Sequence, residues 1–182
     1  MWRYLSDSFW MGGSLRISSV SLPNEGLCCV EKEKRMNKAL FSSNRMDWET
    51  PDSLFNELNN EFGFTLDAAS SDENAKVKRH YTERDNGLVQ NWGGETVWCN
   101  PPYGKELPKW IEKCAKEGMK ENTTVVMLIP ARTDTKAFHE YIYGKSEIRF
   151  LRGRVKFVGA KNGAPFPSMI VVFRGEANAT NQ

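Results

Sequence analysis

The tetrapeptide Asn100-Pro101-Pro102-Tyr103 is the part of this 182-residue sequence best suited to chemistry. It follows residues 96–99, a short apolar run that predicts a β-strand, and the two prolines end that strand because they have no backbone N–H to donate. Ligands in open α/β sheets bind at the carboxyl ends of strands, where this loop is expected to lie. A purely structural turn at the strand end is the alternative interpretation.

The side chains of this loop fit the activation of an amine that is conjugated to an aromatic ring. Such an amine is a poor nucleophile because its lone pair is delocalised into the ring. The side-chain oxygen of Asn100 and the carbonyl of Pro101 can each accept a hydrogen bond from it, which would localise the lone pair for attack on a sulfonium methyl group. Pro102 stiffens the loop, and Tyr103 offers a flat face on which an extruded base can stack, worth about 1–3 kcal/mol.

Strand and helix signals alternate before the loop. Thr50 is expected to be the N-cap of a helix that has Pro51 at its first position and ends at Gly63. Residues 64–69 predict a short strand that runs into a turn of small residues, and residues 71–79 are compatible with a helix.

The same alternation continues after the loop. A helix is expected from about Pro108, and the apolar run 125–129, which lacks alternation, predicts a strand buried on both faces. Asp134 is expected to cap a further helix, and strands are expected over 148–157 and 168–173, the last two pairing antiparallel. The order predicts an α/β fold with a mainly parallel sheet.

The bulk composition is that of a single folded domain. No apolar run approaches the ~18 residues of a membrane span, and the N-terminus lacks the pattern of a signal peptide. The net charge of +2 is weak support for a nucleic-acid partner. None of the four cysteines forms a C-x-x-C pair, so neither structural zinc nor a disulfide framework is expected, and a reducing cytoplasm fits.

Residues 1–44 differ from the rest and are expected to be a disordered N-terminal extension or a leader that the natural protein lacks. The run Glu31-Lys32-Glu33-Lys34-Arg35 implies purine-rich codons directly before Met36, as in a bacterial ribosome-binding site, and favours Met36 as the natural start. A genuine partner-binding tail is the alternative. Residues 45–175 are expected to form the folded domain and residues 176–182 a flexible tail.

Several segments resemble, in order, the small DNA N-6-adenine methyltransferases of bacteriophages and prophages. They are residues 48–51, 64–69, 100–103, 130–135, 150–154 and 164–168, and the similarity covers roughly residues 45–175. The loop at 100–103 matches the family signature [DNS]-P-P-[YFW] in full. The resemblance implies a Rossmann-like methyltransferase fold with helices on both faces of the sheet and S-adenosylmethionine as the methyl donor. It also implies N6-methyladenine in DNA as the product. The expected partner is double-stranded DNA with a flipped adenine, because a base inside a duplex is out of reach, and the expected location is the cytoplasm of a bacterial host cell.

The cofactor site is predicted at Thr50 and Pro51, at the turn Asp67-Ala68-Ala69, and at Asp85. The turn lacks the G-x-G pattern found in many methyltransferases, but small residues can also permit close backbone approach, and Asp67 could bind the ammonium group of the cofactor. Asp85 is expected at the ribose or adenine of the cofactor. The structural alternatives are a helix cap for Thr50, a strand-end turn residue for Asp67 and a turn former for Asp85.

The predicted DNA contacts are Arg132, Arg152, Arg154, Lys156 and Phe166. Arg152 and Arg154 alternate and would share one face of a strand over 148–157, where they could contact phosphates. A solvated basic face is the alternative for these cations, and a proline-stiffened loop is the alternative for Phe166. His80 and His139 show no metal-ligand spacing, so no metal is expected.

Two other functions use the same features. An amino-methyltransferase acting on N4 of cytosine or on protein glutamine N5 would need the same loop, although the basic residues and the similarity outside the loop favour adenine in DNA. A catalytically inactive DNA-binding module is the second, and the intact loop argues against it. The methylation would protect DNA from restriction or mark the DNA of the element itself. No pattern in the sequence indicates which DNA sequence is recognised or how many copies of the chain assemble.

Overall fold

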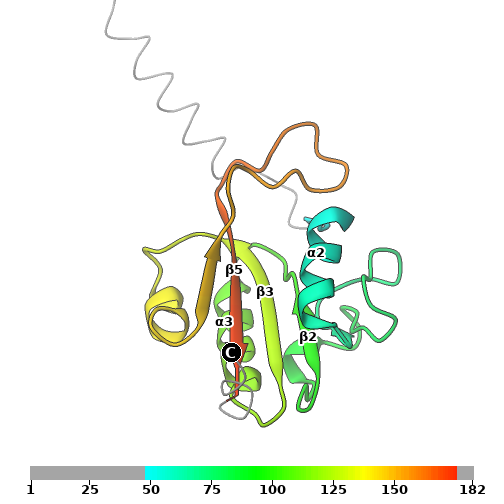
Figure 1. Ribbon diagram of the computed structural model, residues 1–182, viewed down its shortest axis with the longest axis vertical. Helices are drawn as coiled ribbons and strands as arrows, with labels where there is room; N and C mark the ends of the chain where they lie inside the picture. The colour runs from blue at the N-terminus through cyan, green and yellow to red at the C-terminus, as the bar shows by residue number, and fades with distance from the viewer. Residues whose placement is uncertain (1–47, 176–182) are drawn as a thin grey trace, which may run out of the picture. The chain divides into compact units, whose positions relative to one another are not determined.

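The structure, a computed structural model, describes residues 48–175, which contain one five-stranded sheet. The strands β1 (Leu66–Asp67), β2 (Thr96–Cys99), β3 (Thr124–Pro130), β4 (Glu147–Phe150) and β5 (Ser168–Arg174) lie in the order β1-β2-β3-β5-β4 (Figure 1). Strands β1, β2 and β3 are parallel, whereas β5 runs antiparallel to both β3 and β4. This confirms the predicted α/β class and the C-terminal antiparallel strand. The predictions for residues 1–47 and 176–182, including the start at Met36, lie outside the described residues.

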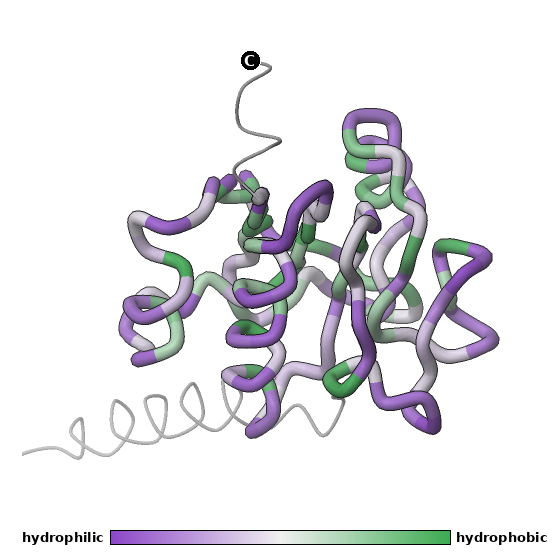
Figure 2. The backbone as a smooth tube through the Cα atoms, turned by 90° about the horizontal axis from the view of Figure 1, so that it is seen from below, coloured by the Kyte–Doolittle hydropathy of each residue, from purple (hydrophilic) through white to green (hydrophobic). Residues whose placement is uncertain are grey.

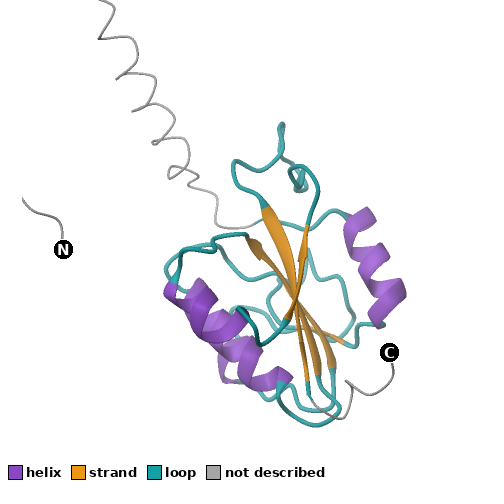
Figure 3. Cartoon of the chain, turned by 60° about the vertical axis from the view of Figure 1, so that its left-hand side comes forward, coloured by secondary structure: helices purple, strands orange, loops and turns teal. Residues whose placement is uncertain are grey.

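Helices cover both faces of the sheet, as Figure 3 shows with the strands seen nearly edge-on. Helix α2 (Asp52–Phe62) packs on one face through Phe55 and Leu58, next to Trp98 of β2. Helix α3 (Leu107–Gly118), the 3-10 turn η1 (Gly87–Val89) and the π-helical turn η2 (Phe138–Ile142) cover the other face. Hydrophilic and hydrophobic residues alternate around the helical turns, as expected of helices with one buried face (Figure 2).

The strands β2, β3 and β5 are buried on both sides, which agrees with the unbroken apolar run predicted for β3. Odd-numbered residues of β3, such as Val125 and Met127, face α3, and even-numbered residues such as Val126 and Leu128 face α2. The fold is therefore the Rossmann-like sandwich that the resemblance implied.

Three local predictions were wrong. Residues 71–79 form turns rather than a helix, because the segment has no apolar face to bury and follows the cavity described below. The strand predicted over 148–157 ends at Phe150, and residues 151–167 form a long connection to β5. The cap predicted for Asp134 is made by Thr135, whose hydroxyl oxygen accepts from Phe138 N at 3.3 Å.

Within residues 48–175 no helix is long and apolar enough to cross a membrane. The same part of the chain holds no group of three or more His, Cys, Asp or Glu residues placed to bind a metal ion. Cys99 and Cys114 are buried free thiols, and burial raises the pKa of Cys99.

Candidate active site

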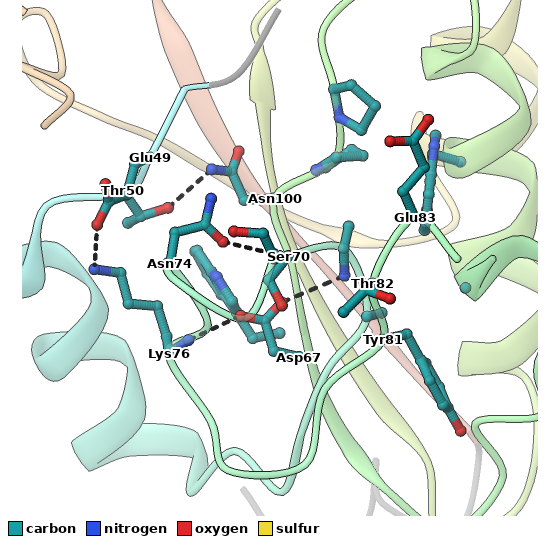
Figure 4. Close-up of a pocket in the computed structure, with 18 of the residues that line it drawn as sticks. Glu49, Thr50, Asp67, Ser70, Asn74, Lys76, Tyr81, Thr82, Glu83 and Asn100 are labelled. Carbon is teal, nitrogen blue, oxygen red and sulfur yellow. Dashed lines mark hydrogen bonds and ion pairs between the residues drawn. The ribbon is translucent and has the colours of Figure 1, made fainter. Parts of the chain in front are cut away.

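A cavity of about 660 Å³ lies at the carboxyl ends of β1 and β2. Its walls come from the segment before α2, the turn after β1, the long connection from β1 to β2, the loop after β2, and the start of α3 (Figure 4). The volume is in the range of about 300–1,000 Å³ that is typical of small-molecule sites. Parallel strands place their carboxyl ends at one edge of a sheet, so the fold brings these segments together.

Seven of the residues singled out in the sequence line the cavity: Asn100, Pro101, Pro102, Thr50, Asp67, Ala68 and Ala69. The structure thus places the Asn-Pro-Pro loop and the turn after β1 around one space. Pro51 and Asp85 are beside the cavity but do not line it, and Tyr103 is behind the loop. Arg132, Arg152, Arg154, Lys156 and Phe166 are not part of its wall.

The carboxamide of Asn100 is held by hydrogen bonds on both sides. Its Nδ2 donates to the backbone carbonyl of Trp48 and, at 3.0 Å, to the hydroxyl oxygen of Thr50. Its Oδ1 accepts from the hydroxyl of Tyr103 at 2.9 Å. Thr50 is 2 % exposed and does not cap α2, which has Pro51 at its N-cap position and no side-chain cap. The interpretation of Thr50 as a helix cap is therefore wrong.

Tyr103 lies between the two hydrophobic cores rather than in the cavity wall. Its hydroxyl is 2.9 Å from Asn100 Oδ1 and 3.2 Å from the carbonyl of Leu128. Burial raises the pKa of Tyr103 well above its ordinary value, so the phenol keeps its proton and remains a donor at any working pH. Its ring contacts the rings of Phe157 and Phe166 edge-on, with centroids 6.1 and 5.6 Å away.

Asp67 ends β1 as a buried carboxylate at the floor of the cavity. Burial raises the pKa of Asp67, although hydrogen bonds from the backbone N–H groups of Lys76 and Ala69 oppose this shift. These hydrogen bonds hold the carboxylate in place. They also keep the start of the connection between β1 and β2 wrapped around it. A buried anion at a strand end is suited to a cationic ligand.

The charged side chains of the cavity wall are mostly acidic. Six carboxylates line it, from Glu49, Asp67, Asp72, Glu73, Glu83 and Glu106, against the two cations of Lys76 and Arg84. Lys76 is paired with two acids, Glu49 at 3.2 Å and Asp52 at 2.7 Å. The excess of negative charge favours a ligand that carries positive charge and disfavours one that carries several phosphates.

Apart from the prediction at Asp85, sequence reasoning missed the part that residues 70–88 play in the site. Asn74, Lys76, Tyr81 and Thr82 all line the cavity, but nothing in their spacing indicates a ligand. The available signal was their polarity, since a long connection inside a compact α/β domain is often functional. Gly87 closes this connection against β1, where a Cβ atom would meet the carbonyl oxygen of Ala68 at 2.2 Å.

Asp85 makes a local turn. Its Oδ2 accepts from the backbone N–H of Thr82 at 2.9 Å and from the Thr82 hydroxyl at 2.7 Å, and these bonds lower the pKa of Asp85. Its neighbours Arg84 and Asn86 line the cavity, whereas Asp85 does not. This geometry agrees with the alternative interpretation of Asp85 as a residue that forms a turn. The turn holds the neighbouring residues Arg84 and Asn86, which line the cavity.

The connection between β4 and β5, residues 151–167, is anchored next to the Asn100 loop by two aromatic side chains and extends beyond the ends of both strands (Figure 1). Phe157 and Phe166 contact Trp48, with ring centroids 5.1 and 5.5 Å apart, and both contact Tyr103. The backbone N–H of Val158 donates to the carbonyl of Glu49 at 3.0 Å. Phe166 therefore lies beside the catalytic candidates although it is outside the cavity.

The predicted DNA-binding cations are exposed in this part of the chain. Arg152, Arg154 and Lys156 project from the β4–β5 connection, and Arg132 follows β3. None of the ion pairs formed among residues 48–175 involves these four residues. By contrast, Arg149 of β4 pairs with Glu61 of α2 and contacts the ring of Phe62.

Comparisons with known proteins agree with this geometry. The sequence profile of the DNA N-6-adenine-methyltransferase (Dam) family matches residues 38–179. The DNA N-6-adenine-methyltransferase of Escherichia phage T1 is 32 % identical over 133 residues, which cover 64 % of this chain and 55 % of the phage protein. A protein of Escherichia coli (strain K12) with the provisional name of methyltransferase YfdM is 38 % identical over 63 residues, or 31 % of this chain and 69 % of that protein.

This chain thus spans about half the length of the phage T1 protein, whereas the family profile covers most of the chain. The matched range includes the whole cavity and the connection between β4 and β5. A match of that extent shows the family. The chain belongs to the DNA N-6-adenine-methyltransferase (Dam) family.

Proposed function

We propose that this protein transfers a methyl group from S-adenosylmethionine to the N6 amine of adenine in DNA. The observation that carries the proposal is the position of the Asn100-Pro101-Pro102 loop, which faces a carboxylate-rich cavity at the carboxyl ends of two parallel strands. A loop packed away from any cavity would have argued against the proposal. Membership of the family supports adenine as the methylated base.

The donor set of the cavity fits S-adenosylmethionine, which carries a sulfonium and an ammonium group. Asp67 would hold the ammonium group, and the small residues Ala68 and Ala69 allow the cofactor close to the backbone. Six lining carboxylates complement the positive charge of the cofactor. When bound, the cofactor supplies an electrophilic methyl group.

The chain itself holds and activates the amine. Asn100 Oδ1 has two lone pairs, of which one receives the Tyr103 hydroxyl and the other is available to the adenine amine. The carbonyl of Pro101 supplies the second acceptor. Two acceptors on one NH2 group favour tetrahedral nitrogen, which makes its lone pair available. In this proposal Tyr103 and Phe166 border the base, and their edge-on contact sets the spacing between the two rings.

DNA binding is assigned to the exposed cations outside the cavity. Arg132, Arg152, Arg154 and Lys156 would contact phosphates of a duplex from which the adenine is flipped, because a stacked base cannot reach Asn100. This division of charge keeps the polyanionic substrate outside an acidic cavity. The bacterial host cytoplasm, where such DNA is found, is the proposed location.

The direct test is to express the chain in a host that lacks adenine methylation and to map modified bases in the DNA. We expect N6-methyladenine, and its absence in the Asn100→Ala variant. N4-methylcytosine in the DNA, or labelled methyl groups recovered only in protein, would replace the proposal with one of the alternative amino-methyltransferases. Cofactor binding without any methylated product would indicate a binding module.

A further inference from the structure

The carboxamide of Asn100 has more hydrogen-bond partners than its proposed contact with substrate requires. Both Nδ2 hydrogens have acceptors, the carbonyl of Trp48 and the hydroxyl of Thr50, and both acceptors belong to the segment that leads into α2. Residues 48 and 50 are some fifty positions away from Asn100 along the chain. The fold has therefore brought a distant segment to the nitrogen side of one amide.

These partners determine which way the amide faces. A backbone carbonyl can only accept a hydrogen bond, so the atom of Asn100 that faces Trp48 must be the nitrogen. The oxygen then faces Tyr103, which donates to it. A rotated amide would bring two oxygen atoms into contact at Trp48. Only the observed orientation presents Oδ1 as an acceptor for an incoming amine.

Of the two acceptors of Nδ2, only the Thr50 hydroxyl belongs to a side chain and can be removed by substitution. It is buried, lines the cavity and accepts from Nδ2 at 3.0 Å (Figure 4). Without its hydroxyl one Nδ2 hydrogen would lose its acceptor in a partly buried site, and the amide would be held on the nitrogen side by a single bond. With one hydrogen bond fewer the carboxamide turns more readily about its Cβ–Cγ bond, so Oδ1 would be less often in position although Tyr103 still donates to it.

We propose that Thr50 is a positioning residue, which together with the Trp48 carbonyl orients the Asn100 carboxamide so that Oδ1 faces the target amine. The inference rests on the proposed function and adds to it, because Thr50 acts on the rate of transfer through Asn100 and not only on cofactor affinity. Tyr103 completes the arrangement from the oxygen side.

The test compares Thr50→Val, which has nearly the same shape but no hydroxyl, with Thr50→Ser, which keeps the hydroxyl. We measure methyl transfer to DNA at saturating S-adenosylmethionine and saturating DNA. The valine variant should be slower by about tenfold or more, and the serine variant should stay within about threefold of the wild-type rate. Thr123→Val is the matched control, since Thr123 is also fully buried and accepts from Gly94 N at 2.9 Å but is not part of the cavity.

A slow rate that recovers at high cofactor concentration would make Thr50 a cofactor ligand only and would overturn the inference. Equal loss in the serine variant would overturn it as well. Thr50→Ala replaces the valine variant if the latter does not fold.

A second measurement does not depend on catalysis. Hydrogen exchange of the Asn100 side-chain amide, followed by NMR in the DNA-free protein, should accelerate about tenfold or more in Thr50→Val and stay unchanged in Thr123→Val. Unchanged exchange in Thr50→Val would overturn the positioning role. If the wild-type protein methylates no DNA, the proposed function fails, and the exchange rates still decide whether Thr50 holds the amide.

Discussion

The cavity and the β4–β5 connection are adjacent, but they differ in charge and in construction. Six carboxylates line the cavity, whereas Arg152, Arg154 and Lys156 project from the connection into solvent. An acidic recess attracts a compact cation, and an exposed basic loop attracts a polyanion. In the proposed function, one small domain binds two ligands of opposite charge because the two kinds of side chain lie on separate segments.

The two regions are also held in place differently. The cavity residues directly follow β1 and β2, so the hydrogen bonds of the sheet determine where Asp67 and Asn100 lie. The β4–β5 connection has no strand partner over residues 151–167. Its anchors include Phe157 and Phe166 against Trp48 and Tyr103, and the hydrogen bond from Val158 N to the carbonyl of Glu49. We therefore expect substitutions in the cavity to affect chemistry and substitutions in the connection to affect DNA affinity.

Of the substitutions that test this difference between the two regions, Asn100→Ala should have the largest effect, and it should act on the rate of methyl transfer. Alanine cannot accept from the amine, so methyl transfer should fall by about 10²–10³, the usual loss when one acceptor or donor of a preorganised site is removed. Cofactor affinity, measured by calorimetry, should change little, because the proposed ammonium contact is made by Asp67. A rate near that of the wild type would contradict the assigned role of Asn100.

Asp67→Asn should weaken cofactor binding by about tenfold or more, because the buried negative charge is lost while the size of the side chain is kept. Titration calorimetry with S-adenosylmethionine measures this affinity. Equal affinity in the variant and the wild type would remove Asp67 from the cofactor site.

The pH dependence of that affinity has a definite sign. Burial raises the pKa of Asp67, so cofactor affinity should fall as the pH drops through this raised value, by about tenfold per pH unit below it. The contribution to folding has the opposite sign. It is present when the carboxyl is protonated, below its ordinary pKa, and is lost as the pH rises through the raised pKa. In Asp67→Asn both dependences should flatten, which calorimetry and urea titrations across the acidic range can check.

Arg152→Ala should have a smaller effect, confined to DNA. Loss of one phosphate contact should weaken binding and reduce the slope of log affinity against log salt by about 1, while cofactor affinity stays the same. Fluorescence anisotropy with a labelled duplex at several salt concentrations measures the slope. If the slope of the variant equals that of the wild type, Arg152 does not contact a phosphate.

Arg149→Ala should have the smallest effect and provides the matched control. Arg149 is also basic and close in sequence, but it pairs with Glu61 and Glu147 and contacts Phe62, and its side chain is 33 % exposed. We expect a loss of about 1 kcal/mol in the free energy of unfolding, measured by urea titration, with no change in the salt dependence of DNA binding. A reduced salt slope in this variant would show that the ion-paired Arg149 also contacts a phosphate, and that ion pairing does not distinguish it from Arg152.

Local patterns in the sequence were sufficient for much of the fold and for the centre of the site. The apolar run at β3, the helix that ends at Gly63 and the strand that ends before Asn100 all depend on neighbours along the chain, and the structure confirms each of them. The Asn-Pro-Pro-Tyr loop was identifiable because its chemistry is contained in four consecutive residues.

Tertiary structure decided whatever depends on contacts between distant segments. Thr50 has the sequence signature of a helix cap, yet its hydroxyl accepts from Asn100, because the packing of α2 against the sheet brings the two side chains together. Tyr103 resembles an open stacking surface in the sequence, but in the fold the rings of Phe157 and Phe166 contact it edge-on and its hydroxyl donates to Asn100. Residues along the chain determined which chemistry is available, and only the folded arrangement decided which way the Asn100 amide faces and which charges surround it.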